Sequence, residues 1–111
     1  MPKGKRVERS VESTEYAIQF GTREAERGWG DLLAVQRNVL TAAWDPLSRD
    51  PNEVTPTMHP LKGKLATFTH NGGVRERWQY ELSGGAGIWY YVSGRTVVLE
   101  QVHTRHPNQT K

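Results

Sequence analysis

The hydrophobic and polar positions of this chain follow two different periods. Tyr16, Ile18 and Phe20 alternate with Ala and Gln neighbours, and this period of two predicts one short, half-buried strand. From Thr22 to about Arg49 the apolar residues recur every three or four positions, which predicts helix with Thr22 as the N-cap. The apolar stripe of this second segment consists of Leu32, Leu33, Val35, Val39, Leu40, Ala43 and Trp44.

Glycine, asparagine and proline mark where the helical segment is interrupted. Gly28 and Gly30 offer a break near its start, Asn38 offers another in the middle, and Pro46 can end one helix or begin a new turn. Two helices are therefore expected, with the break at one of these positions. Residues 50–60 then hold three prolines among polar residues, which predicts a loop between the helices and the following strands.

Strand patterns separated by glycine-containing turns dominate the rest of the chain. Four strands are expected, over Leu65–Thr69, Arg77–Leu82, Ile88–Val92 and Thr96–His103. The order of strand, helices and strands predicts an α+β fold. We expect a small antiparallel β-sheet, joined by the N-terminal strand, with a helical hairpin packed on one face.

Length and composition restrict the classes of protein that the chain can belong to. Its 111 residues fit one domain, expected over residues 15–111, because residues 1–14 are almost entirely polar or charged and resemble a flexible arm. A net charge of +3 favours a polyanionic partner without requiring one. The chain has no cysteine, which excludes disulfides and thiolate metal sites. Because no leader-like or membrane-length apolar stretch occurs, we expect a cytoplasmic protein without membrane contact.

Three motifs of the second half resemble, in this order, the RelE/ParE superfamily of bacterial toxins. Residues 59–65 (HPLKGKL) resemble the Pro-Leu-Lys-Gly-x-Leu stretch that many RelE-type toxins carry between their helices and their sheet. Residues 77–82 (RWQYEL) and 88–92 (IWYYV) resemble that family's W-R-Y-R-V…R-V-I-Y-x-V hairpin, and residues 96–103 (TVVLEQVH) resemble its last strand. The resemblance covers roughly residues 16–106.

The resemblance implies a RelE-like fold and a toxin of a type II toxin–antitoxin system. Such a protein is an endoribonuclease that cleaves mRNA in the ribosomal decoding site, inhibits translation and is neutralised by a cognate antitoxin protein. The family also contains ParE-type inhibitors of DNA gyrase, which are not enzymes. A gyrase inhibitor and a catalytically weakened RNA-binding member of the family therefore remain alternatives to the nuclease.

RNA cleavage in this family resembles a transesterification that uses neither a metal nor another cofactor. A base takes the proton of a ribose 2′-OH, cations stabilise the phosphorane, and an acid protonates the leaving 5′-oxygen. His59 stands where one RelE branch has a Glu regarded as the general base, and histidine exchanges protons near neutral pH. Lys62 and Arg77 are the candidate cations. The alternative is that His59 is an ordinary histidine of a surface loop and Lys62 an ordinary solvated side chain.

Three further residues are candidates for RNA binding. Lys64 lies next to Lys62 in the motif, and Arg75 projects from the same side of an extended chain as Arg77 because the two are two positions apart. Trp78 follows directly, and a guanidinium beside an aromatic ring can bind a phosphate and stack on a base. The alternative for Trp78 is packing in the core or against a neighbouring strand.

The end of the last strand is expected to supply the acid. His103, Arg105 and His106 lie where RelE-type toxins place a catalytic Arg, His or Tyr, and the strand register decides which of them faces the substrate. The spacing His103-x-x-His106 is also conceivable for a metal, but two ligands without Cys or carboxylate support make a poor site. We therefore expect no metal.

Gly87 is the main departure from the family pattern. Many members carry a catalytic Arg just before the strand that corresponds to residues 88–92. Losing one transition-state cation costs on the order of 3 kcal/mol, about a hundredfold in rate, unless Arg75, Arg77 or Arg105 replaces it. Three explanations stay open: a divergent active site, a naturally weakened toxin, or a substitution introduced so that a lethal protein can be expressed.

Overall fold

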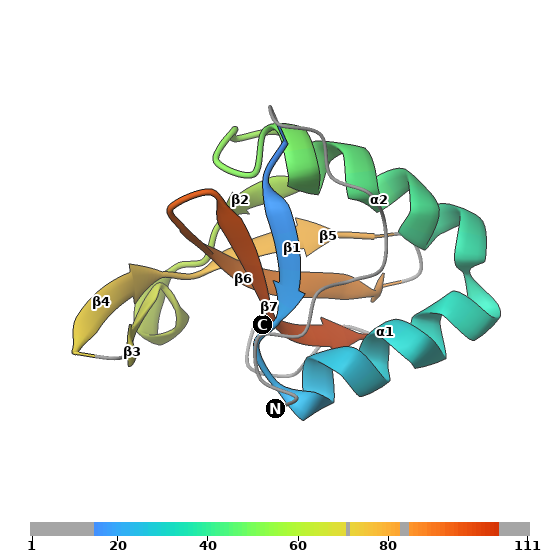
Figure 1. The fold of residues 1–111 in the computed structure, drawn as a ribbon, viewed down its shortest axis with the longest axis horizontal. Coiled ribbons are helices and arrows are strands. Elements are labelled where there is room, and N and C mark those ends of the chain that lie inside the picture. The colour runs from blue at the N-terminus through green and yellow to red at the C-terminus, as the bar shows by residue number, and fades with distance from the viewer. Residues whose placement is uncertain (1–14, 71, 83–84, 105–111) are drawn as a thin grey trace.

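The computed structural model describes residues 15–70, 72–82 and 85–104 of the chain. The expected arm over residues 1–14 lies outside these ranges. Within them, one strand is followed by two helices and six further strands (Figure 1). These elements are β1 (Ala17–Phe20), α1 (Arg23–Val35), α2 (Arg37–Arg49), β2 (Met58–Pro60), β3 (Thr67–His70), β4 (Gly73–Glu76), β5 (Trp78–Glu81), β6 (Gly87–Ser93) and β7 (Thr96–His103), with a 3₁₀ turn at Gly63–Leu65.

The main sheet has five strands in the order β1-β7-β6-β5-β2, and β3 and β4 form a separate hairpin. Both helices lie on one side of the main sheet (Figure 1), which confirms the α+β class. The N-terminal strand joins the sheet as predicted, but β1 runs parallel to β7 while the other pairs are antiparallel, so the sheet as a whole is mixed. The alternation of residues sets which face of a strand is buried, but it does not set the strand's direction.

Two details of the strand pattern also differ from expectation. The proline-rich segment expected to be only a loop contains β2, and its Pro60 lies at the edge of the sheet, where a missing N–H is tolerated. The strand expected from Leu65 begins two residues later as β3, after the 3₁₀ turn, and pairs with β4 instead of joining the main sheet. In Figure 1 this hairpin projects from the end of the sheet opposite the helices.

The helices begin and break at defined positions. The side-chain oxygen of Thr22 accepts a hydrogen bond of 2.9 Å from the N–H of Ala25, which confirms Thr22 as the N-cap of α1. The break between the helices lies at Gln36, which ends α1 and precedes α2. Gly28 is not a break, because it lies buried inside α1, where a Cβ would collide with the carbonyl oxygen of Val102. Glycine at this position lets α1 lie close against β7.

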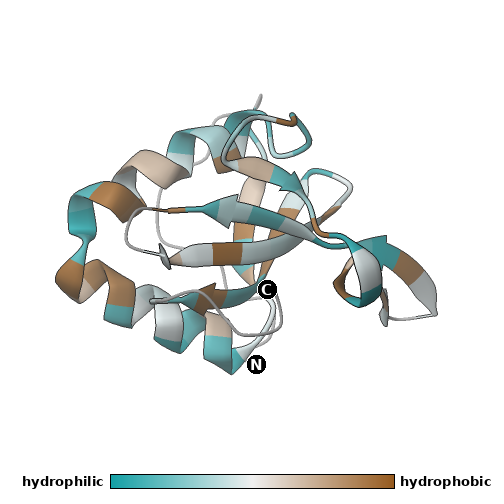
Figure 2. Cartoon of the chain, turned by 180° about the vertical axis from the view of Figure 1, so that it is seen from behind, coloured by the Kyte–Doolittle hydropathy of each residue, from teal (hydrophilic) through white to brown (hydrophobic). Residues whose placement is uncertain are grey.

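The hydrophobic core fills the space between the helices and one face of the main sheet. Figure 2 shows hydrophobic and hydrophilic residues alternating along the strands and helices that enclose it. Tyr90 is completely buried, and its hydroxyl donates a hydrogen bond of 2.8 Å to the carbonyl oxygen of Pro51. Burial raises the pKa of Tyr90 far above its usual value. No helix among the described residues is long and apolar enough to cross a membrane.

Candidate functional site

The face of the main sheet that does not bear the helices, called the helix-free face below, brings together candidate and other residues from four strands. Met58, Trp78 and Tyr90 belong to the core, so their immediate neighbours on the same strands lie on the opposite face. One row across the strands joins His59, Gln79 and Trp89, and the next row joins Glu81, Gly87 and His103. The candidates His59 and His103, 44 positions apart in the sequence, therefore share one face.

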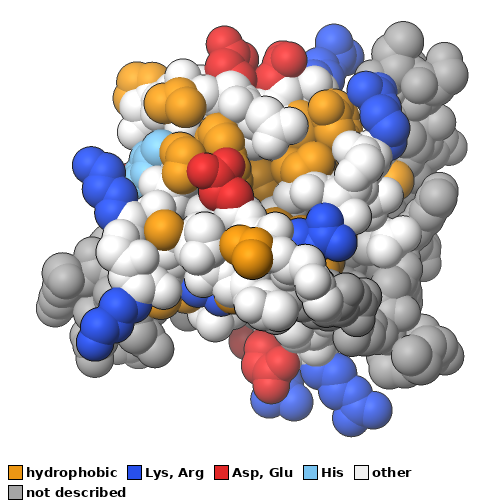
Figure 3. Space-filling view, turned by 90° about the vertical axis from the view of Figure 1, so that its left-hand side faces the viewer, with side chains coloured by type: hydrophobic (Ala, Val, Ile, Leu, Met, Phe, Trp, Pro, Cys, Tyr) orange, Lys and Arg blue, Asp and Glu red, His pale blue; other side chains and the backbone are white. Residues whose placement is uncertain are grey.

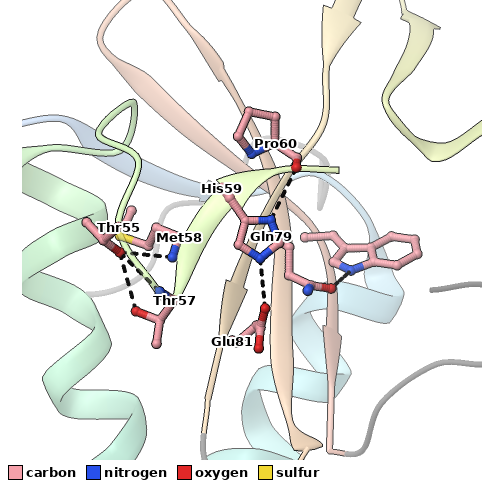
Figure 4. Close-up of polar contacts among 8 residues, drawn as sticks. Thr55, Thr57, Met58, His59, Pro60, Gln79 and Glu81 are labelled. Atoms are coloured by element: carbon pink, nitrogen blue, oxygen red, sulfur yellow. Dashed lines mark hydrogen bonds and ion pairs between the residues drawn. The ribbon is translucent and has the colours of Figure 1, made fainter. Parts of the chain in front are cut away.

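His59 is held at the sheet edge by two oxygen atoms. Its Nε2 lies 2.7 Å from Oε2 of Glu81, and its Nδ1 lies 3.2 Å from the carbonyl oxygen of Pro60 (Figure 4). The two side chains are partly accessible, since 32% of the His59 surface and 50% of the Glu81 surface are exposed. His59 does not lie in a surface loop, because it is part of β2, and its ring forms a pair with a carboxylate.

A small pocket of about 30 Å³ opens beside Gly87 on the helix-free face. Its lining residues are Gln79, Glu81, Leu82, Gly85, Ala86, Gly87 and His103. A Cβ added to Gly87 would lie 3.3 Å from the carbonyl oxygen of Tyr80 and 3.7 Å from Cδ2 of the His103 ring. A side chain at position 87 would therefore begin at this pocket, but its Cβ would be tight against the Tyr80 carbonyl oxygen, which would have to give by a few tenths of an ångström.

Trp89 connects the two rows of residues on the helix-free face. The indole N–H of Trp89 donates a hydrogen bond of 2.8 Å to Oε1 of Gln79, and both side chains are buried. The His103 ring packs edge-on against Trp89, with 5.0 Å between the ring centroids. Because Trp89 contacts both Gln79 and His103, it fixes the position of the His103 imidazole relative to β5.

Arg77 is engaged by other side chains on this face. Its Nε and Nη2 donate hydrogen bonds of 2.7 and 3.1 Å to the two carboxylate oxygens of Glu100, and its Nη1 donates one of 3.1 Å to the carbonyl oxygen of Leu65. The guanidinium also lies 4.7 Å from the centre of the Phe68 ring and 5.6 Å from that of Trp89. Arg77 thus connects the β3-β4 hairpin to β6 and β7, and its charge is balanced by Glu100.

Glu100 reaches Arg77 because of a bulge in β7. Trp89 of β6 pairs with Gln101, but the next residue, Tyr90, pairs with Leu99, so Glu100 is an extra residue without a partner of its own on β6. Bulges of this kind redirect a side chain at the edge of a site.

The remaining predicted cations lie around the edge of the site. Lys62 and Lys64 are exposed beside the 3₁₀ turn. Arg75 lies 6.0 Å from the centre of the Tyr91 ring, so Arg75 and Arg77 both lie over aromatic rings of β6, as their spacing predicts. Figure 3 shows the end of the molecule that bears the β3-β4 hairpin, where hydrophobic side chains gather towards the middle and most charged side chains lie towards the margins. Burial raises the pKa of Tyr91, an effect that Arg75 partly opposes.

The prediction that Trp78 stacks on an RNA base is wrong. Its ring lies in the core with 5% of its surface exposed, and its indole N–H donates a hydrogen bond of 3.0 Å to Glu76. Trp78 follows Arg77 by one position on an extended chain, so it points to the opposite face, towards the helices. Core packing, the alternative interpretation, is therefore correct for this residue.

Two predicted residues cannot be placed, and several unpredicted ones belong to the site. Arg105 and His106 lie outside the described residues. Glu81 and Glu100 were not among the candidates. Alternation along the strand places Glu81 on the same face as Gln79, so the sequence did contain a signal for the position of Glu81. Among the residues that the structure describes, no three His, Asp or Glu side chains are grouped to hold a metal ion.

Searches of protein-family models, curated proteins and solved structures found no match to this chain. The case for a function therefore rests on the residues of the helix-free face and on the motifs that they carry.

Proposed function

We propose that this protein is a RelE-type toxin, a metal-free endoribonuclease that cleaves mRNA on the ribosome and so inhibits translation. The observation that carries the proposal is that His59, paired with Glu81, and His103 lie on one face of the sheet, where Glu81 and His103 line the pocket at Gly87. These residues come from two motifs that resemble the same family. Together with Glu81, they supply groups that can give and take protons within one site.

The small size of the pocket favours a reaction in which another molecule positions the RNA substrate. About 30 Å³ is far too little space to enclose a nucleotide, so the protein can contact the reacting phosphate but cannot itself orient the RNA on both sides. A ribosome that holds the mRNA in line for attack would supply the missing orientation. Exposed Lys62 and Lys64 are suitable for contacts with the RNA backbone.

A catalytically weakened RNA-binding protein is the second candidate, and two observations favour it. Gly87 has no side chain to bind a phosphate, and the charge of Arg77 is balanced by Glu100. Both features reduce the positive charge available beside the pocket. A ParE-type gyrase inhibitor is supported less well, because such an inhibitor has no need for Glu81 and His103 around one pocket.

The proposal includes a cognate antitoxin as the partner that keeps the toxin inactive. An acidic segment of that protein is expected to cover the helix-free face and to screen Lys62, Lys64 and Arg75. Co-purification with one small acidic protein encoded by an adjacent gene would support this part of the proposal. Harmless overproduction of the unmodified chain alone would contradict it.

The experiment that tests the function is primer extension on cellular mRNA after brief induction. The nuclease predicts new 5′ ends within translated regions, together with fragments that carry a 2′,3′-cyclic phosphate. His103→Gln is the matched variant and should remove these ends while the protein stays folded. Growth arrest with unbroken mRNA and accumulated cleaved gyrase complexes would replace the nuclease with the gyrase inhibitor.

A further inference from the structure

The pocket beside Gly87 has a carboxylate on one side and an imidazole on the other. Glu81 pairs with Gly87 between β5 and β6, and Gly87 pairs with His103 between β6 and β7, so the three residues form one row. Since neighbouring strands lie about 4.8 Å apart, the Cα atoms of Glu81 and His103 are separated by roughly 10 Å. Gly87 leaves the space between their side chains open, and both side chains line the pocket.

His59 is placed differently from Glu81. It is not among the residues that line the pocket, and both of its ring nitrogens face oxygen acceptors. The two hydrogen bonds form together only when both nitrogens carry hydrogen, and a ring in that state cannot accept a proton. If Nδ1 carries no hydrogen, it still faces the carbonyl oxygen of Pro60 at 3.2 Å and not the pocket. His59 is therefore arranged to hold the carboxylate of Glu81.

We propose that Glu81 is the general base of the cleavage reaction, that His103 is the general acid, and that His59 is a positioning residue for Glu81. This assignment rests on the proposed nuclease function and changes the role that the sequence motif gave to His59. Half of the Glu81 side chain is exposed, so a substrate hydroxyl can reach it.

The chemical step is complete with these groups alone. The Glu81 carboxylate takes the proton of the ribose 2′-OH while the 2′-oxygen forms a bond to the adjacent phosphorus. The bond between phosphorus and the 5′-oxygen breaks, and the protonated His103 imidazole gives its proton to that oxygen. The products are a 2′,3′-cyclic phosphate and a 5′-hydroxyl, and a proton passes from Glu81 to His103 through solvent to restore the enzyme.

Single-turnover cleavage of a short mRNA bound to purified ribosomes tests the assignment with the full-length protein. Glu81→Gln should lower the rate by about a hundredfold or more, within the range of general base catalysis. Glu53→Gln changes a carboxylate on an exposed loop after α2 and serves as the matched control with an unchanged rate. Glu81→Gln is nearly isosteric and half exposed, and thermal unfolding checks that each variant is folded.

A second substrate separates the base from the acid. In it, sulfur replaces the 5′-oxygen at the cleavage site, and because a thiolate leaves without protonation, the reaction no longer needs an acid. His103→Gln should be slower by about a hundredfold on the normal RNA but within about threefold of the unaltered protein on the sulfur substrate. Glu81→Gln should be equally impaired on both substrates.

The positioning role of His59 is tested by combining variants. His59→Gln should slow cleavage by about tenfold, and adding it to Glu81→Gln should cause no further loss, because both act through one carboxylate. A purely structural role would instead lower the melting temperature and add to the effect of Glu81→Gln. Proton-coupled ¹⁵N NMR of the histidine rings should also show the His59 Nε2–H signal shift in Glu81→Gln.

The possible results separate this assignment from the function on which it rests. A Glu81→Gln rate within threefold of the unaltered protein, while the unaltered protein cleaves, overturns the assignment and leaves the nuclease intact. If His103→Gln cleaves the sulfur substrate no faster than the normal RNA, His103 is not the general acid. If the unaltered protein leaves both RNAs whole on ribosomes, the nuclease proposal fails and this assignment fails with it.

Discussion

The contribution of the Arg77–Glu100 ion pair to the stability of the protein can be tested quantitatively. Arg77 gives two hydrogen bonds to the carboxylate of Glu100, and the two side chains are only 13% and 18% exposed. Exposed ion pairs contribute about 0–1 kcal/mol, whereas removing one member of a buried pair costs about 3–5 kcal/mol. At this intermediate exposure we expect Glu100→Gln to lower the free energy of unfolding by about 2 kcal/mol.

The double-mutant cycle isolates the pair from its other contacts. Arg77→Met also removes the hydrogen bond to Leu65 and the contacts with Phe68 and Trp89, so it should cost about 3 kcal/mol. When the two substitutions are combined, the total should be smaller than their sum by about 1.5–2 kcal/mol. Urea unfolding followed by tryptophan fluorescence measures all four proteins, and Glu100→Gln alone should lower the melting temperature by about 10 °C.

Two results would refute this account of the ion pair. One is a coupling energy below about 0.5 kcal/mol, the value typical of an exposed pair. The other is disappearance of the coupling in 1 M NaCl, because salt screens exposed charges far more than partly buried ones. Either result would mean that Arg77 is available to the substrate, as the sequence motif suggests. In that case Arg77→Met should impair RNA cleavage more than its loss of stability accounts for.

Three further substitutions have effects that follow from the packing. Gly87→Arg adds a cation to the pocket and should cleave RNA roughly tenfold to a hundredfold faster than Gly87→Met. The gain in rate is smaller if the new guanidinium pairs with Glu81, and equal rates for the two variants would contradict the proposed site. Gly28→Ala should lower the free energy of unfolding by about 1–3 kcal/mol or more, because its Cβ collides with the Val102 carbonyl group. Gly30→Ala in the same helix has open space around its Cβ and should stabilise the protein slightly, and urea unfolding measures both variants. Because burial raises the pKa of Tyr90, this tyrosine ionises in the unfolded chain at a lower pH than in the folded protein. The stability linked to it is fully present below about pH 10 and falls above that pH, by up to about 1.4 kcal/mol per pH unit. Tyr90→Phe should therefore be about 1 kcal/mol less stable than the unaltered protein at pH 8, because it lacks the hydrogen bond to Pro51, but it should lose less stability between pH 10 and 11. If both proteins lost stability equally over this pH range, the ionisation of Tyr90 would not be the cause of the loss.

The sequence predicts best those elements whose pattern is repeated and bounded by glycine turns. The last strand, expected over Thr96–His103, has those bounds in the structure, and β6 exceeds its expected range by only one residue at each end. By contrast, β2 holds three residues in a proline-rich segment, too few for alternation to be visible. Its existence depends on pairing with β5, which lies beyond the range of local patterns.

The same limit applies to the candidate site. His59 and His103 were found because each belongs to a recognisable motif. Glu81 was missed because its partner His59 lies 22 positions earlier and meets it only through the register of β2 and β5. Glu100 was missed because alternation along β7 fails at the bulge. Residues whose neighbours are set by long-range register need a structure to be identified.

The position of Thr22 has a consequence for the time at which the protein can fold. Its hydroxyl donates a hydrogen bond of 2.8 Å to the carbonyl oxygen of Glu100, 78 positions later, and both α1 and β1 pack mainly against β7. The first half of the chain therefore lacks its principal packing surface until the last strand has been synthesised, and at about 5–20 residues per second that interval is roughly 4–16 s. For this period the nascent chain has neither its closed core nor the row of β5, β6 and β7 residues around Gly87, so the site forms only after β7 has been synthesised.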